Sequence, residues 1–139
     1  MTKTYIFGLL ITLIICSCQS KVSKGNDSPI KEPQGTYFVQ TLNGQSVSDR
    51  SITLIFEASK GQVSGSGSCN QYSATYTVSK QNIKFSQVIS TKKMCPGSAE
   101  VEQNFFTSLA EVNKVKLEGA TLELYKGEEK LITAKSKEE

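Results

Sequence analysis

From Gly35 onward, the chain consists of short β-branched or alternating segments separated by turn signals. The clearest segment is residues 72–78, where Tyr72 and Tyr76 fall on one face and Thr75 and Thr77 on the other, the period of a half-buried strand. Similar segments lie at residues 36–42, 52–57, 62–67, 83–85, 88–91, 114–117, 121–125 and 130–134. Asn43-Gly44, directly after the first of these segments, is a strong short turn signal. Short strands joined by regular turns predict an antiparallel sheet.

One segment has helical rather than strand periodicity. The apolar residues at helical spacing between residues 99 and 112 are Val101, Phe105, Leu109 and Val112. Ser98 is a suitable N-cap, and Glu100 and Glu102 favour the positive end of the helix dipole. The sequence therefore predicts an α+β fold: a curved antiparallel sheet, an open barrel-like meander, packed on one α-helix.

The N-terminus has the organisation of an export signal. Lys3 precedes an apolar run at residues 5–15. A bilayer span takes about 20 helical residues, so this run is better suited to a signal peptide than to a transmembrane anchor, which remains the alternative.

The end of this apolar run resembles the lipobox of bacterial lipoproteins. Ile15-Cys16-Ser17-Cys18 places an aliphatic residue three positions before Cys18 and small residues directly before it. Cys16 is a poorer acceptor because bulky Ile15 would precede it. This resemblance implies cleavage after Ser17, attachment of diacylglyceryl and palmitate to Cys18, and anchoring to the cell envelope through that lipid, expected at the outer membrane.

The remaining cysteines, Cys69 and Cys95, form an even pair in a chain predicted to be exported. When an even number of cysteines is left in a protein of an oxidising compartment, they usually form disulfides. Two buried free thiols are the alternative. No Cys-x-x-Cys motif favours redox activity, and two cysteines without histidine would leave a zinc site half empty.

These features divide the chain into four parts. Residues 1–17 are the expected signal peptide, and residues 18–34 the lipidated cysteine and a polar, proline-containing tether. Residues 35–135 form the expected globular domain, and residues 136–139 a tail.

The composition argues against several classes of function. The chain has no histidine, the commonest general base and metal ligand, so we expect no catalytic residues, metal site or cofactor. Without Lys3, 15 basic and 13 acidic residues leave a net charge of 15 − 13 = +2, too low for nucleic-acid binding. Lys84, Lys92 and Lys93 could form a small basic patch facing anionic lipid, although such lysines usually form a solvated face.

Two segments and the predicted helix resemble the META, or HslJ-like, domain family. The family pattern is carried by Gly67, Cys69, Asn70 and Tyr72 in the first segment and by Thr91, Met94, Cys95 and Pro96 in the second. The resemblance covers about residues 35–134. Tyr37 stands where the family usually has tryptophan, and Lys92-Lys93 stands where it often has Arg-Met.

The resemblance implies a secreted or lipid-anchored domain without enzymatic activity, linked to heat shock, stress tolerance or structural support. Its implied fold is an antiparallel sheet around a helix, similar to lipoprotein pilotins. That similarity provides the alternative function, a module that binds a hydrophobic ligand or an outer-membrane client.

The segment Cys69-Asn70-Gln71-Tyr72 has two interpretations. It could line a groove with an amide, a phenol and sulfur. More simply, a disulfide could fix the loop before the helix to the sheet, with Asn70 bonding to backbone at a turn.

Overall fold

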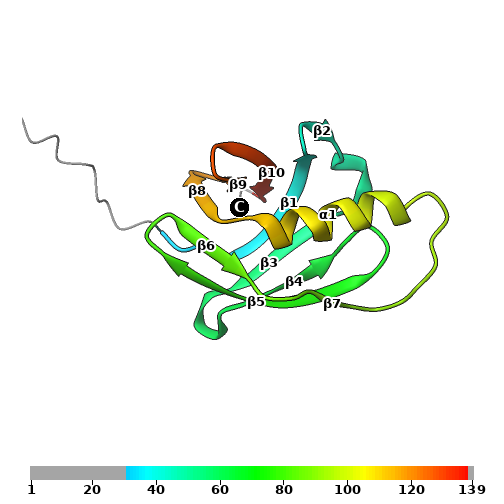
Figure 1. The fold of residues 1–139 in the computed structure, drawn as a ribbon, viewed down its shortest axis with the longest axis horizontal. Helices are drawn as coiled ribbons and strands as arrows, with labels where there is room; N and C mark the ends of the chain where they lie inside the picture. The colour runs from blue at the N-terminus through cyan, green and yellow to red at the C-terminus, as the bar shows by residue number, and fades with distance from the viewer. Residues whose placement is uncertain (1–30, 138–139) are drawn as a thin grey trace, which may run out of the picture.

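The computed structural model describes residues 31–137. This part of the chain forms ten strands and one α-helix (Figure 1). The strands are β1 (Gly35–Leu42), β2 (Gln45–Ser46), β3 (Thr53–Glu57), β4 (Gln62–Ser66), β5 (Gln71–Ser79), β6 (Asn82–Phe85), β7 (Ile89–Ser90), β8 (Lys114–Glu118), β9 (Thr121–Lys126) and β10 (Glu129–Ser136). The helix is α1 (Ala99–Glu111), and the 3-10 turns are η1 (Ser48–Arg50) and η2 (Ala58–Lys60). Strand β10 therefore extends into the segment expected to be a tail.

The sheet closes on itself, so the expected open meander packed on a helix is wrong. Neighbouring strands follow the order β1-β3-β4-β5-β6-β8-β9-β10, and β10 then pairs with β1 to complete an eight-stranded antiparallel barrel. The closing register joins Tyr37 to Ser136 and Leu42 to Ile132. Closure removes the unpaired edges that an open sheet would expose.

Irregularities in the two closing strands help the sheet to curve. The β1–β10 register shifts between Val39 and Thr41, and the β10–β9 register shifts between Lys130 and Ile132. A bulge bends its strand and increases the local twist. Both shifts lie where the first and last strands must turn toward each other.

Helix α1 crosses the barrel rather than covering an outer face. It contacts β1 and β6, which lie on opposite sides of the ring (Figure 1). Phe105 and Leu109 are fully buried and belong to the same core cluster as the inward-facing strand residues. Ser98 occupies the N-cap position, but its side chain makes no capping hydrogen bond, contrary to the expected role.

Aromatic side chains fill much of the interior, as expected for a small barrel. Six aromatic side chains are buried, and Phe106 is half-buried against them. Phe56 packs edge-on against Tyr76, with ring centroids 5.2 Å apart. The buried rings are those of Tyr37, Phe56, Tyr72, Tyr76, Phe85 and Phe105.

The buried tyrosines predict a loss of stability at alkaline pH. Burial raises the pKa of Tyr72, and burial together with the nearby Glu32 carboxylate raises the pKa of Tyr76 to about 12. Unfolded tyrosines ionise near pH 10. The folded state therefore holds more protons above pH 10, so this contribution to stability is complete below pH 10 and is lost as pH rises through about 12.

Ultraviolet absorbance and circular dichroism, followed together during an alkaline titration, check this expectation. Tyrosinate from Tyr72 and Tyr76 should appear only with loss of the folded signal, whereas in concentrated urea it should appear near pH 10. Ionisation of all tyrosines near pH 10 in the folded protein would contradict the expectation.

Candidate functional site around the disulfide

A disulfide connects the β4–β5 turn to the loop before α1. Cys69 lies between β4 and β5, Cys95 lies between β7 and α1, and their Cα atoms are 5.9 Å apart. The bond closes a 26-residue separation and fixes the loop against the barrel.

Beneath the disulfide, the Glu102 carboxylate of α1 binds the β4–β5 turn. Its Oε1 accepts hydrogen bonds from the backbone N–H of Asn70 at 2.6 Å and of Cys69 at 3.4 Å. Its Oε2 accepts from Nδ2 of Asn70 at 2.6 Å. Asn70 is 5% exposed and Glu102 is 9% exposed. Short hydrogen bonds to a charged group are stronger than neutral ones, so Glu102 is a main link between helix and barrel.

The Asn70 side chain extends this network to the loop that follows β7. Its Oδ1 accepts from Oγ1 of Thr91 at 2.8 Å and from the backbone N–H of Lys93 at 2.7 Å. Its Nδ2 also lies 3.3 Å from the carbonyl oxygen of Lys93. An amide offers two donors and two acceptor sites, and here all four are used. Asn70 therefore joins turn, helix and loop, and has no hydrogen-bonding capacity left for a substrate.

Tyr72 supports the same region from strand β5. Its hydroxyl donates to the carbonyl oxygen of Thr53 at 2.9 Å. Its ring packs edge-on against Phe105 and Phe106 of α1, with centroids 5.4 and 5.5 Å away. The phenol is therefore a packing and hydrogen-bonding group between β3, β5 and the helix.

The glycines of strand β4 and the following turn permit close approach of neighbouring groups. A Cβ on Gly65, whose φ is +151°, would lie within 3 Å of the Thr53 backbone. A Cβ on Gly67 would lie 2.7 Å from the ring of Phe106 and 2.9 Å from Oε1 of Glu102. Close strand pairing thus requires glycine at position 65, and contact with the helix requires it at position 67.

Alanine substitutions should separate these two requirements. Gly65→Ala is expected to lower the free energy of unfolding by more than about 3 kcal/mol, because backbone must move and φ is strained. Gly67→Ala should cost about 1–2 kcal/mol, because the Phe106 ring can move outward. Urea denaturation followed by circular dichroism measures both, and an equal or reversed order would contradict this account. Exposed Gly119→Ala, also at positive φ but with open space around it, is a control for strain alone.

The structure brings most of the predicted family-motif residues into one cluster. Those that meet there are Gly67, Cys69, Asn70, Tyr72, Thr91 and Cys95. Met94 and Pro96 are in the same loop but point into solvent, and Met94 is 97% exposed. Cys18 lies outside the described residues.

The role of Glu102 in this site is not evident from the local sequence. Its position in the first turn indicates only a favourable helix-dipole interaction. Its actual partners, Cys69 and Asn70, are more than thirty residues earlier in the chain. No local pattern identifies such a pairing.

The three lysines considered as one basic patch are separated. Lys92 and Lys93 lie beside the first turn of α1, whereas Lys84 lies with Ala110 and Glu111 near its last turn. A helix of 13 residues is about 20 Å long. A single patch of these lysines is therefore not formed.

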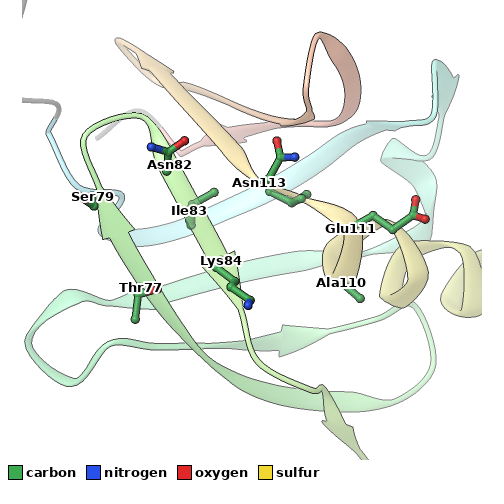
Figure 2. A pocket seen from close by; sticks show the side chains of 9 residues that line it. Thr77, Ser79, Asn82, Ile83, Lys84, Ala110, Glu111 and Asn113 are labelled. Carbon is green, nitrogen blue, oxygen red and sulfur yellow. The ribbon is translucent and has the colours of Figure 1, made fainter.

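An open groove of about 490 Å³ lies near the end of α1 (Figure 2). Most of the residues that line it are polar or charged, including Thr77, Asn82, Lys84 and Glu111, although much of the exposed surface is apolar. Glu111 also binds Lys126 at 3.0 Å. The groove is not the deep apolar cavity that would indicate a hydrophobic ligand.

Residues 31–137 contain neither a metal-binding cluster nor a membrane-spanning helix. No three histidine, cysteine, aspartate or glutamate residues are grouped as ligands within this part of the chain. Its one α-helix is too short to cross a bilayer.

Three solved structures share this fold. A protein determined by NMR is 23% identical, with a TM-score of 0.58 over 73% of this chain and 88% of its own. A DUF4847 family protein from Bacteroides vulgatus is 15% identical, with a TM-score of 0.59 over 76% and 94%. A protein from Burkholderia xenovorans, also determined by NMR, is 18% identical, with a TM-score of 0.56 over 82% and 97%. These similarities establish the fold alone.

Sequence comparison identifies the family. No curated protein sequence matches the chain significantly. The model of the META domain matches residues 29–139, which include the whole barrel and the disulfide-linked cluster. The chain therefore belongs to the META domain family.

Proposed function

We propose that this chain is a lipid-anchored cell-envelope protein whose META domain acts without catalysis in envelope stress tolerance or structural support, at the outer membrane. The observation that carries the proposal is the Cys69–Cys95 disulfide. Disulfides persist in oxidising compartments such as the bacterial periplasm and cell surface. This agrees with the signal peptide and lipidated Cys18 expected from the sequence.

The disulfide-linked cluster supports a structural rather than a chemical role. The amide of Asn70 is saturated, and the Glu102 carboxylate is buried against it. A general base or nucleophile needs access to a substrate atom within hydrogen-bond distance. The polar groups of this cluster instead hold α1 and its preceding loop against the barrel.

The packed interior favours this function over binding of a hydrophobic ligand. One continuous cluster of buried side chains extends through the barrel and includes Phe105 and Leu109 of the crossing helix. An acyl chain or apolar peptide under α1 would have to displace these side chains. Loss of such packing costs about 2–5 kcal/mol for each large residue.

Metabolic labelling tests the anchor at Cys18. With radioactive palmitate, the full chain should be labelled and should fractionate with membranes, whereas Cys18→Ser should remain unlabelled and uncleaved. Cys16→Ser is the matched control and should be labelled normally. Labelling of the Cys18→Ser variant, or its loss in Cys16→Ser, would refute the site.

Complementation tests the function itself. In a deletion strain of the source bacterium, the wild-type chain should restore growth under heat and oxidative envelope stress, and Cys18→Ser should not. Equal growth of the deletion and wild-type strains under these stresses would overturn the proposal.

A further inference from the structure

The side chain of Met94 is unusually exposed at the molecular surface. Its side chain is 97% exposed, the greatest exposure among the large hydrophobic residues described. A single exposed apolar residue often has no role. Here, however, the residues on both sides of Met94 are fixed to the domain.

The backbone of Lys93 is held by the buried amide of Asn70, which binds both its N–H and its carbonyl oxygen. Cys95 is held by the disulfide to Cys69. The backbone on both sides of Met94 is therefore fixed, by the amide of Asn70 and by the disulfide, at a position where the Met94 side chain is exposed. These attachments keep Met94 from folding back onto the barrel.

Two lysines directly precede Met94 in this loop. Lys92 and Lys93 are exposed, and neither forms an ion pair within residues 31–137. Arg50 is a third cation close to this loop, because its Nη1 donates a hydrogen bond to the carbonyl oxygen of Gly97 at 3.3 Å. Unlike the two lysines, Arg50 forms an ion pair, with Asp49. An apolar side chain flanked by lysines complements an anionic bilayer, whose headgroups attract lysine and whose interface accepts apolar groups.

The tether allows the loop to reach a bilayer. The loop extends from the end of the molecule opposite the first described residues (Figure 1). Residues 18–34 span about 55 Å when extended. A compact domain of ~100 residues has a radius of gyration of about 13 Å, or a diameter of about 34 Å, so a fully extended stretch of residues 18–34 would exceed the width of the domain. A chain anchored at Cys18 can therefore lie with either end against the membrane.

We propose that the loop of residues 91–97 is a second membrane contact, in which Met94 enters the interface of an anionic lipid bilayer and Lys92 and Lys93 bind its phosphates. This inference rests on the proposed lipid anchor. The second contact makes the orientation of the domain depend on lipid composition. On anionic membranes the loop binds the bilayer, whereas on neutral membranes the domain is attached only through Cys18.

Vesicle binding by the lipid-free mature chain, residues 19–139, tests the loop separately from the anchor. This chain contains every residue of the buried core. Because the protein has no tryptophan, Met94→Trp introduces a unique fluorescent reporter. Its emission should shift to the blue with vesicles containing phosphatidylglycerol and should not shift with pure phosphatidylcholine. Gln81→Trp, exposed at the β5–β6 turn, is the control and should not shift with either.

Co-sedimentation measures the contribution of each group. Lys92→Gln/Lys93→Gln should weaken binding to anionic vesicles about 25-fold, or about fivefold for each lysine. Met94→Ser should weaken it about tenfold. The charge-matched control Lys116→Gln/Lys126→Gln changes exposed lysines elsewhere and should retain binding close to that of the wild type.

Oxidation provides a further check on Met94. It is the only methionine after Met1 is removed with the signal peptide. Mild peroxide should convert it to the polar sulfoxide and lower vesicle binding as Met94→Ser does.

Absence of vesicle binding, an unshifted tryptophan at position 94, or equal weakening by the control lysines would overturn the proposal and point to a protein partner or a second copy. Because Cys18 is absent from this experiment, these outcomes would leave the palmitate-labelling result unaffected.

Discussion

Replacing Glu102 by alanine is expected to lower the free energy of unfolding by about 3–5 kcal/mol. The substitution removes two hydrogen bonds of 2.6 Å between the carboxylate and Asn70, each worth about 1.5–3 kcal/mol. It also leaves the buried N–H of Asn70 without its partner. Urea denaturation of the lipid-free chain, followed by circular dichroism, measures the change.

Glu100→Ala is the matched control for Glu102→Ala. Both glutamates lie in the first turn of α1 and interact favourably with its dipole, but Glu100 is exposed. Its removal should cost no more than about 1 kcal/mol. If the two substitutions cost the same, Glu102 acts only through the dipole and the role assigned to its contacts is wrong.

Glu102→Gln refines the test. The variant keeps the size of the side chain but replaces one acceptor oxygen by an NH₂ donor. One of the two N–H groups of Asn70 would then face a donor, so we expect an intermediate loss of about 1–3 kcal/mol. Full stability in this variant would contradict the hydrogen-bond assignment.

Removal of the Cys69–Cys95 bond is expected to cost about 3.5 kcal/mol, from the chain entropy of a 26-residue loop. This is a large part of the 5–15 kcal/mol typical of a folded domain. Cys69→Ala/Cys95→Ala should therefore lower Tm by more than about 10 °C. The barrel should still fold, because Asn70 continues to bind the loop through Thr91 and Lys93.

The reductant dithiothreitol provides the control for this experiment. It should destabilise the wild-type lipid-free chain by the same amount and leave the double variant unchanged. Thiol counting on the denatured, unreduced wild-type chain should detect no free thiol. Two free thiols, or a wild-type Tm insensitive to reduction, would refute the structural role of the bond.

The strands were predictable because their signals are local. Asn43 and Gly44 both adopt positive φ, as the two-residue hairpin signal requires, and the alternation in residues 72–78 corresponds to β5. The helix was equally clear from Phe105 and Leu109. Barrel closure was not predictable, because the β1–β10 pairing joins the two ends of the domain and no short-range pattern specifies it.

The site was predictable only in part for the same reason. The motifs shared with the META family include Cys69, Asn70 and Cys95, which do meet in the structure. Asn70 was expected to bond to backbone at a turn, and it does so at Lys93, but its strongest contacts are with Glu102. A carboxylate on a helix surface and a buried carboxylate have the same sequence signature, so only the packing of α1 distinguishes them.

The pairing of the first strand with the last has a consequence for biogenesis. Strand β1 cannot complete its hydrogen bonds until β10 has been synthesised, so the barrel stays open until almost the entire chain is available. Contacts between distant parts of a chain also form slowly. A nascent polypeptide of this kind therefore remains incompletely folded for longer than one built from local contacts.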